Sequence, residues 1–182
     1  MSSVVIAGDS SGTVTLQAPS AAGSTVLTLP ATSGTVITTG STFAGTGPAF
    51  SAYSTAGQSV SNGVFTKIQL NAEEFDTNSN FDSTTNYRFT PTVSGYYFLN
   101  GQVEVSGAGA GETVAAIYKN GSVAKSGIDI TATVYGATVS GLIYLNGSTD
   151  YVELYVYVPA TRNLINSGAQ YNYFQGFLAR AA

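Results

Sequence analysis

The 182-residue sequence contains no cysteine and no histidine, and only 9% of its residues are charged. Without these two residue types the chain has no ordinary zinc site, no disulfide framework, and no catalytic triad or dyad built on His or Cys. The 6 Lys and Arg stand against 10 Asp and Glu, which gives a net charge of −4. Because a nucleic-acid backbone is neutralised by clustered basic side chains, nucleic acid is not expected as a direct partner.

Long apolar runs are also missing. The sequence has no stretch of about 18 apolar residues, the length of a membrane span. Residues 1–18 have neither the basic start nor the apolar core of a secretory signal. We therefore expect no insertion into a membrane, and the absence of cysteine fits synthesis in a reducing cytoplasm.

Short runs in which apolar and polar residues alternate fill the chain from residue 49 onward, and no helical period of 3.6 residues is present. Glycine and tyrosine are abundant, with 21 and 12 copies. Two Asn-Gly pairs, at 120–121 and 146–147, predict tight hairpin turns. The predicted strands are residues 49–53, 64–70, 86–90, 95–105, 113–118, 122–125, 128–134, 137–145, 151–159 and 171–178. Ten strands indicate an all-β sandwich of two sheets.

The N-terminal part has a different sequence pattern from the segment that begins at residue 49. Residues 13–16, 25–29 and 35–38 are short β-branched runs separated by Gly, Pro or Ser, which predicts small strands. Strands so short build no core of their own, so they are expected to need a partner surface, although a flexible linker is the alternative. The candidate attachment residues are Val14, Leu16, Val26, Leu27, Leu29, Val36 and Ile37. We therefore divide the chain into an N-terminal arm, residues 1–46, and a C-terminal domain, residues 47–182.

An ordered set of motifs runs through the C-terminal domain. It consists of Phe65 with Asn71, the pair Phe81-Asp82, Phe89 with Gly95 and Tyr97, and the stretches 117–121, 144–158 and 174–178. In spacing and order this set resembles the C1q-like globular head of the complement and adiponectin group, although Leu99 stands where that family has Phe. The resemblance implies a ten-stranded jelly roll, close to that of tumour necrosis factor, and a homotrimer.

The residues give a separate reason to expect self-association. Along 151–159, four aliphatic side chains alternate with Tyr151, Glu153, Tyr155 and Tyr157, so one face suits a core and the other carries three tyrosines. Tyrosine is favoured at interfaces because its ring is buried while its hydroxyl forms hydrogen bonds. The candidate trimer-interface residues are Tyr96, Tyr151, Tyr155, Tyr157, Tyr171, Tyr173 and Phe177. The alternative is a scattered set of surface tyrosines.

Carboxylates gather in one segment, at Glu73, Glu74, Asp76 and Asp82. Glycosidases use a pair of carboxylates as catalytic residues, but the loop expected over 72–80 offers no long groove for a glycan chain. The same oxygen atoms are weak candidates for calcium ligands, and a solvated acidic loop is the plain alternative. We expect no catalytic residue and no cofactor.

The stretch 13–36, TVTLQAPSAAGSTVLTLPATSGTV, resembles attachment segments of tailed-bacteriophage virion proteins. Arm and C-terminal domain together predict a non-enzymatic phage structural protein, located in the virion and assembled in the bacterial cytoplasm. The favoured role is a capsid decoration or cement protein, a homotrimeric knob whose arm binds the major capsid protein or another virion protein. The alternative is a tail-fibre or head-fibre tip that binds a host-surface receptor or glycan. The chain has no coiled coil or long shaft to project such a tip.

Overall fold

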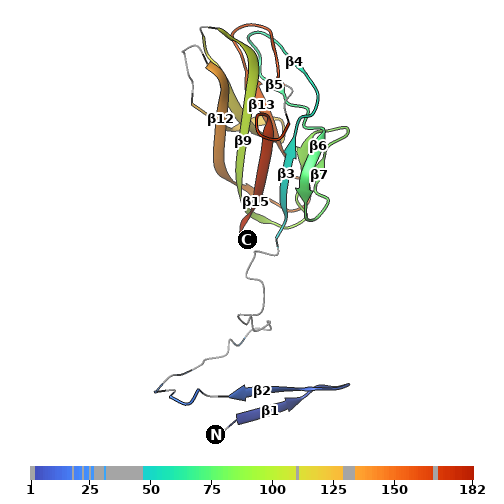
Figure 1. Cartoon of the computed structure of the whole chain (residues 1–182), viewed down its shortest axis with the longest axis vertical. Coiled ribbons are helices and arrows are strands. Elements are labelled where there is room, and N and C mark those ends of the chain that lie inside the picture. The colour runs from blue at the N-terminus through green and yellow to red at the C-terminus, as the bar shows by residue number, and fades with distance from the viewer. Residues whose placement is uncertain are drawn as a thin grey trace. The chain divides into compact units, whose positions relative to one another are not determined.

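The computed structural model describes residues 3–17, 19–21, 23–24, 26, 31, 47–109, 111–128, 134–165 and 168–182. These residues form strands and loops, and no helix that is long and apolar enough to cross a membrane occurs among them. The chain divides into two compact units, Met1–Thr42 and Phe43–Ala182 (Figure 1). We call the first unit the arm and the second the head, and describe each by itself.

The described strands of the arm form a β-hairpin. Strand β1 (Ser3–Ala7) pairs antiparallel with β2 (Thr13–Gln17), and the Gly8 amide donates to the Gly12 carbonyl at 2.9 Å to close the connection. The prediction of a strand at 13–16 is confirmed, whereas β1 was not predicted. Val26 is described, lies outside any strand and is exposed. The other predicted arm strands, with Leu27, Leu29, Val36 and Ile37, lie outside the described residues.

The head is a sandwich of two antiparallel sheets (Figure 1). The five-stranded sheet has the order β12 (Val134–Leu145), β9 (Gly95–Gly109), β15 (Tyr173–Ala181), β3 (Ala49–Tyr53), β6 (Ala72–Asp76). The six-stranded sheet has the order β11 (Ser122–Ser126), β10 (Val114–Lys119), β13 (Val152–Tyr157), β8 (Arg88–Phe89), β7 (Phe81–Asp82), with β5 (Thr66–Lys67) also paired to β13. A small separate pair joins β14 (Arg162–Asn163) to β4 (Ser59–Val60).

Aromatic and aliphatic side chains from both sheets fill the space between them. The rings of Phe50 and Phe89 stack with centroids 4.2 Å apart, and Tyr97 meets Phe89 edge to face at 5.5 Å. The Tyr97 hydroxyl donates to the Val93 carbonyl at 2.7 Å, and burial raises the pKa of Tyr97 to about 12. The predicted alternation along 151–159 is confirmed, because its aliphatic residues Val152, Leu154, Val156 and Val158 are all fully buried.

The all-β class is confirmed, but details of the strand count are not. One six-stranded and one five-stranded sheet hold eleven strands among the described residues, where the sequence predicted ten. The predicted strands 64–70 and 86–90 shrink to the two-residue β5 and β8. The segment 72–80, expected as a loop, begins with β6, which pairs with β3 along the edge of the five-stranded sheet.

The two Asn-Gly pairs have different roles. Asn120 and Gly121 have φ values of 51° and 79° and connect β10 to β11, as predicted for a tight hairpin. The hairpin prediction for Asn146-Gly147 is wrong, because β12 and β13 belong to different sheets. Instead, Asn146 Oδ1 accepts hydrogen bonds from the amides of Ser148, Thr149 and Asp150 and so stabilises the crossing loop.

Candidate functional site

The outer surface of the five-stranded sheet carries several exposed large apolar side chains. Along β9, Tyr97 and Leu99 point into the core, so Tyr96 and Phe98 point outward. The antiparallel register places Tyr144 beside Tyr96, and both Leu142 and Phe177 beside Phe98. Side chains from three neighbouring strands therefore meet on one surface.

We call this surface the apolar face and define it by six large side chains that are exposed in the head. Their exposed fractions are Phe75 50%, Tyr96 49%, Phe98 39%, Leu142 55%, Tyr144 42% and Phe177 51%. Two ring pairs hold neighbours in place, Tyr96 with Tyr144 at 5.5 Å and Phe98 with Phe177 at 5.9 Å. Exposed apolar side chains that are neighbours on one surface are typical of a contact surface with another molecule.

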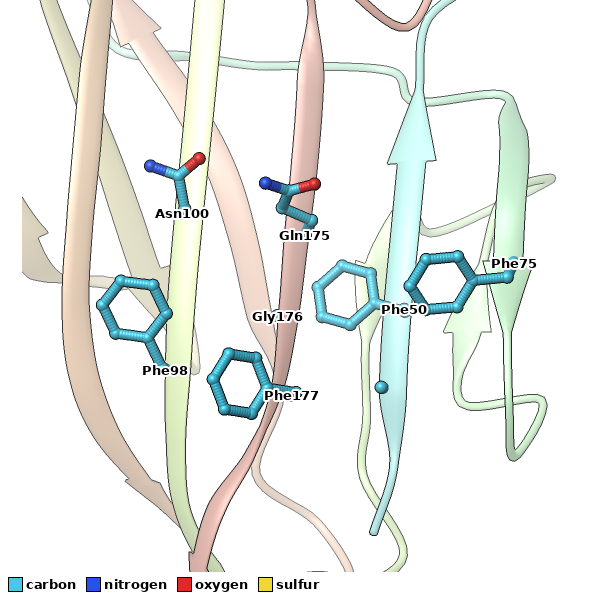
Figure 2. A pocket seen from close by; sticks show the side chains of 8 residues that line it. Phe50, Phe75, Phe98, Asn100, Gln175, Gly176 and Phe177 are labelled. Atoms are coloured by element: carbon cyan, nitrogen blue, oxygen red, sulfur yellow. The ribbon is translucent and has the colours of Figure 1, made fainter. Parts of the chain in front are cut away.

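A hollow of about 170 Å³ lies within the apolar face (Figure 2). Phe75, Phe98 and Phe177 surround it, and the amides of Asn100 and Gln175 lie on one side. Gly176 also lines the hollow, and a Cβ there would come within 2.6 Å of Leu99 Cδ2, so no larger residue fits without displacing the core. The hollow is lined mainly by apolar side chains.

Polar side chains border the apolar face. The register aligns Ser140, Asn100, Gln175 and Ser51 in a row across four strands. Glu74 accepts a hydrogen bond from the Ser51 hydroxyl at 2.7 Å. An apolar centre with a polar margin is the usual anatomy of a protein–protein interface.

The outer surface of the six-stranded sheet also carries aromatic rings, but there they cover one another. Tyr118 stacks on Tyr155 with centroids 3.9 Å apart, and Phe65 lies 5.7 Å from both Tyr118 and Tyr157. All four side chains are partly buried. These rings therefore expose less apolar surface to solvent than the side chains of the apolar face do.

The charges on this second surface are paired as well. The Lys67 ammonium lies 3.0 Å from the Glu153 carboxylate, whose side chain is 6% exposed. The Tyr155 hydroxyl donates to the same carboxylate at 3.5 Å. Burial, together with the Glu153 charge, raises the pKa of Tyr155 to about 12. The Arg88 guanidinium lies 4.3 Å from the centre of the Tyr151 ring.

The structure divides the predicted trimer-interface residues between the two sheets. Tyr96, Tyr173 and Phe177 belong to the five-stranded sheet. Tyr155 and Tyr157 belong to β13 of the six-stranded sheet, with Tyr151 just before it, and Tyr171 lies in the turn that precedes β15. The predicted residues therefore lie on two different outer surfaces of the sandwich.

Sequence reasoning missed Phe75, Phe98, Leu142 and Tyr144 as members of the apolar face. The signal was present in the strands predicted at 95–105 and 137–145. Their alternation places Phe98 beside Tyr96, and Leu142 beside Tyr144, on the side away from the core. Phe75 carried no such signal, because it was assigned to a loop.

The candidate calcium ligands do not gather into a site. Glu73 and Glu74 lie on β6, Asp76 ends that strand, and Asp82 lies on β7. Asp76 accepts hydrogen bonds from the amides of Phe81 and Asn78 at 2.7 and 3.2 Å, so it closes the loop that follows β6. Among the described residues, no three acidic, His or Cys side chains come together in a group that would hold a metal ion.

Neither a protein-family model nor a curated protein sequence matches the chain. Solved structures do match. The globular domain of zebrafish complement 1qA is 19% identical with a TM-score of 0.51, covering 74% of this chain and 99% of that one. Murine APRIL, crystallised at pH 8.0, is 11% identical with a TM-score of 0.54, covering 72% and 98%.

The head has the C1q and tumour-necrosis-factor jelly-roll fold. PRD1 vertex protein P5 shares it, with 19% identity, a TM-score of 0.52, and coverage of 72% of this chain and 71% of that one. The match to P5 covers nearly the same share of this chain as the match to the complement domain, 72% against 74%. Identities of 11–19% establish the fold alone.

Proposed function

We propose that this chain is a non-enzymatic structural protein of a bacteriophage virion, whose C1q-like head assembles into a homotrimer through the apolar face. The observation that carries this proposal is the set of six large apolar side chains exposed on the five-stranded sheet. Burying such a set against other copies removes it from water, which is the main driving force of association. The hollow beside Phe98 and Phe177 receives an apolar side chain of a neighbouring copy.

Two features support a place in the virion. The arm sequence resembles phage attachment segments and forms a β-hairpin, whose strand edges offer backbone donors and acceptors to a further strand. The head shares its fold with the phage PRD1 vertex protein P5, which is a vertex component by its name. We propose that the knob decorates and cements the capsid, with the arm bound to the major capsid protein or another virion protein.

A fibre tip that binds a host-surface glycan is the second candidate. The observation that favours it is the outer surface of the six-stranded sheet, where the rings of Tyr151 and Tyr157 are partly exposed and the Arg88 guanidinium lies 4.3 Å from the centre of the Tyr151 ring. Aromatic rings stack on sugars, and charged groups bond to their hydroxyls. Counting chains per virion distinguishes the two candidates, because cement is present in hundreds of copies and fibre tips in a few trimers.

Light scattering on the purified full chain tests the trimer. The expected mass is about 56 kDa, three times the 18.7 kDa of one chain. Phe177→Asp introduces an unpaired charge into the proposed contact and should give an 18.7 kDa species. The matched control is Val123→Asp on the six-stranded sheet, since Val123 is 50% exposed and Phe177 51%. A wild-type mass of one chain at micromolar concentration would refute the trimer.

A further inference from the structure

The hairpin of the arm has one face made only of aliphatic side chains. The register sets Val4 opposite Leu16 and Ile6 opposite Val14, and residues at these alternate positions share one face. Their exposed fractions are 61%, 52%, 54% and 62%. We call these four residues the aliphatic face of the hairpin.

The opposite side of the ribbon is different. There Val5 lies opposite Thr15, and Ala7 lies opposite Thr13, so small and hydroxyl-bearing side chains predominate. A two-stranded ribbon is marginally stable in water unless its apolar face is covered by a further layer. The described residues of the arm contribute no such layer, and β1 and β2 form a two-stranded sheet.

We propose that the aliphatic face packs against the same face of sister copies, so that the three hairpins form a second trimer contact separate from that of the head. This inference rests on the proposed trimer, which brings three arms together. Each arm is joined covalently to a head, so trimerisation of the heads raises the effective concentration of the hairpins to the range where weak contacts form.

Charge favours a sister copy as the partner. Within Ser3–Gln17 the only ionisable side chain is Asp9, which lies in the connection between β1 and β2 and not on the aliphatic face. Three identical aliphatic faces therefore meet without repulsion between like charges. A charged partner surface would find no complementary group there and would lose its hydration.

Packing through this face leaves the ribbon's edges available. Antiparallel pairing of β1 with β2 uses one edge of each strand, and the edges offer backbone donors and acceptors to a further strand. The arm thus has two separate contacts, a face for its sister copies and an edge for strand addition to the virion. Attachment to the capsid and self-association do not compete for the same atoms.

Single cysteines test the inference, because the natural chain has none. The full chain carrying Ile6→Cys is treated with diamide, which oxidises two thiols to a disulfide, and is resolved on a non-reducing gel. Near a three-fold axis the introduced thiols of sister copies face one another, so a two-chain band is expected from most of the protein. The matched control is Val5→Cys on the opposite side, where Val5 is 58% exposed and Ile6 54%. It should remain mostly single chains.

A second substitution tests whether the disulfide forms because the aliphatic faces pack together or because the thiols collide at random. Adding Val14→Asp to the Ile6→Cys protein should lower the disulfide yield at least about fivefold, because a charge would be buried in the contact. Equal yields from Ile6→Cys and Val5→Cys, in a protein that light scattering shows to be trimeric, would overturn the inference and leave the proposed trimer intact. A disulfide from Ile6→Cys to a capsid protein with Cys, found only in virions, would overturn it as well.

Discussion

Asp82 and Asp150 each hold a loop of the head closed by accepting several hydrogen bonds on one carboxylate. The amides of Thr85 and Thr84 donate to Asp82 at 2.9 and 3.0 Å and hold the pKa of Asp82 well below its ordinary value. The Lys119 ammonium, 2.8 Å from Asp150, and the Asn120 side-chain amide likewise lower the pKa of Asp150. Both carboxyl groups are therefore more acidic in the folded head than in the unfolded chain.

This difference makes the stability of the head depend on pH in a defined direction. A carboxyl group whose pKa is lower in the folded state stabilises that state above the unfolded pKa, which is about 4. The contribution is lost as the pH falls through and below this value. Urea unfolding should give a similar free energy of unfolding at pH 7 and 5 and a lower one at pH 3, and Asp150→Asn should make the fall between pH 5 and 3 smaller. A wild-type free energy that stays constant or rises toward pH 3 would contradict this account.

Asp82→Ala tests the loop directly. The substitution leaves the amides of Thr84, Thr85 and Asn86 without their acceptor, and we expect a loss of about 1–3 kcal/mol in the free energy of unfolding. Glu73→Ala is the control, because Glu73 is an exposed carboxylate on β6, and its expected effect is within about 0.5 kcal/mol. Both values come from urea unfolding at pH 7. Equal effects of the two substitutions would show that Asp82 does not support its loop.

At the scale of elements, strand β13 shows what the alternation of apolar and polar residues predicts and what it does not. Its sequence predicts which side chains enter the core, and Val152, Leu154 and Val156 are fully buried as expected. What alternation does not reveal is which sheet a strand joins, since pairing connects residues far apart in the chain. The predicted interface therefore combined Tyr155 of β13 with Phe177 of β15, which lie in different sheets.

The edge strands show a second limit. Strand β6 contains Glu73, Glu74 and Asp76, a composition that predicts a loop. It is nonetheless a strand, because β3 offers it an unpaired edge with which it forms backbone hydrogen bonds. Phe75 reaches the apolar face only through this pairing. Local composition therefore predicts the central strands well and the edge of the candidate site poorly.

Tyr155→Asp distinguishes the two sheets by experiment. The substitution removes the ring that stacks on Tyr118 and places a second carboxylate beside Glu153. We expect the free energy of unfolding to fall by about 2–4 kcal/mol. The mass of the folded protein should remain that of a trimer, measured by light scattering below the unfolding transition. Dissociation into folded single chains would instead place Tyr155 in the trimer contact.

At the scale of the whole molecule, the proposal gives the two units separate tasks. The head has its own core between two sheets, with Phe50, Phe89 and Phe174 fully buried. The described arm has no core, and its hairpin exposes aliphatic side chains to solvent. A unit with a complete core folds without help, whereas a two-stranded ribbon depends on what covers it. Removal of the arm should therefore change where the protein binds rather than whether it folds.

Deletion of the arm, residues 1–42, tests this division of tasks. The remaining head should be soluble and trimeric at micromolar concentration, with a melting temperature within about 4 °C of the full chain, because the core and the apolar face are retained. It should no longer join the particle, since the strands that we propose add to the virion are gone. Mixing purified particles that lack the protein with either form, followed by sedimentation, measures occupancy. Full occupancy by the truncated head would assign the virion contact to the knob itself, because no arm would be present to make it.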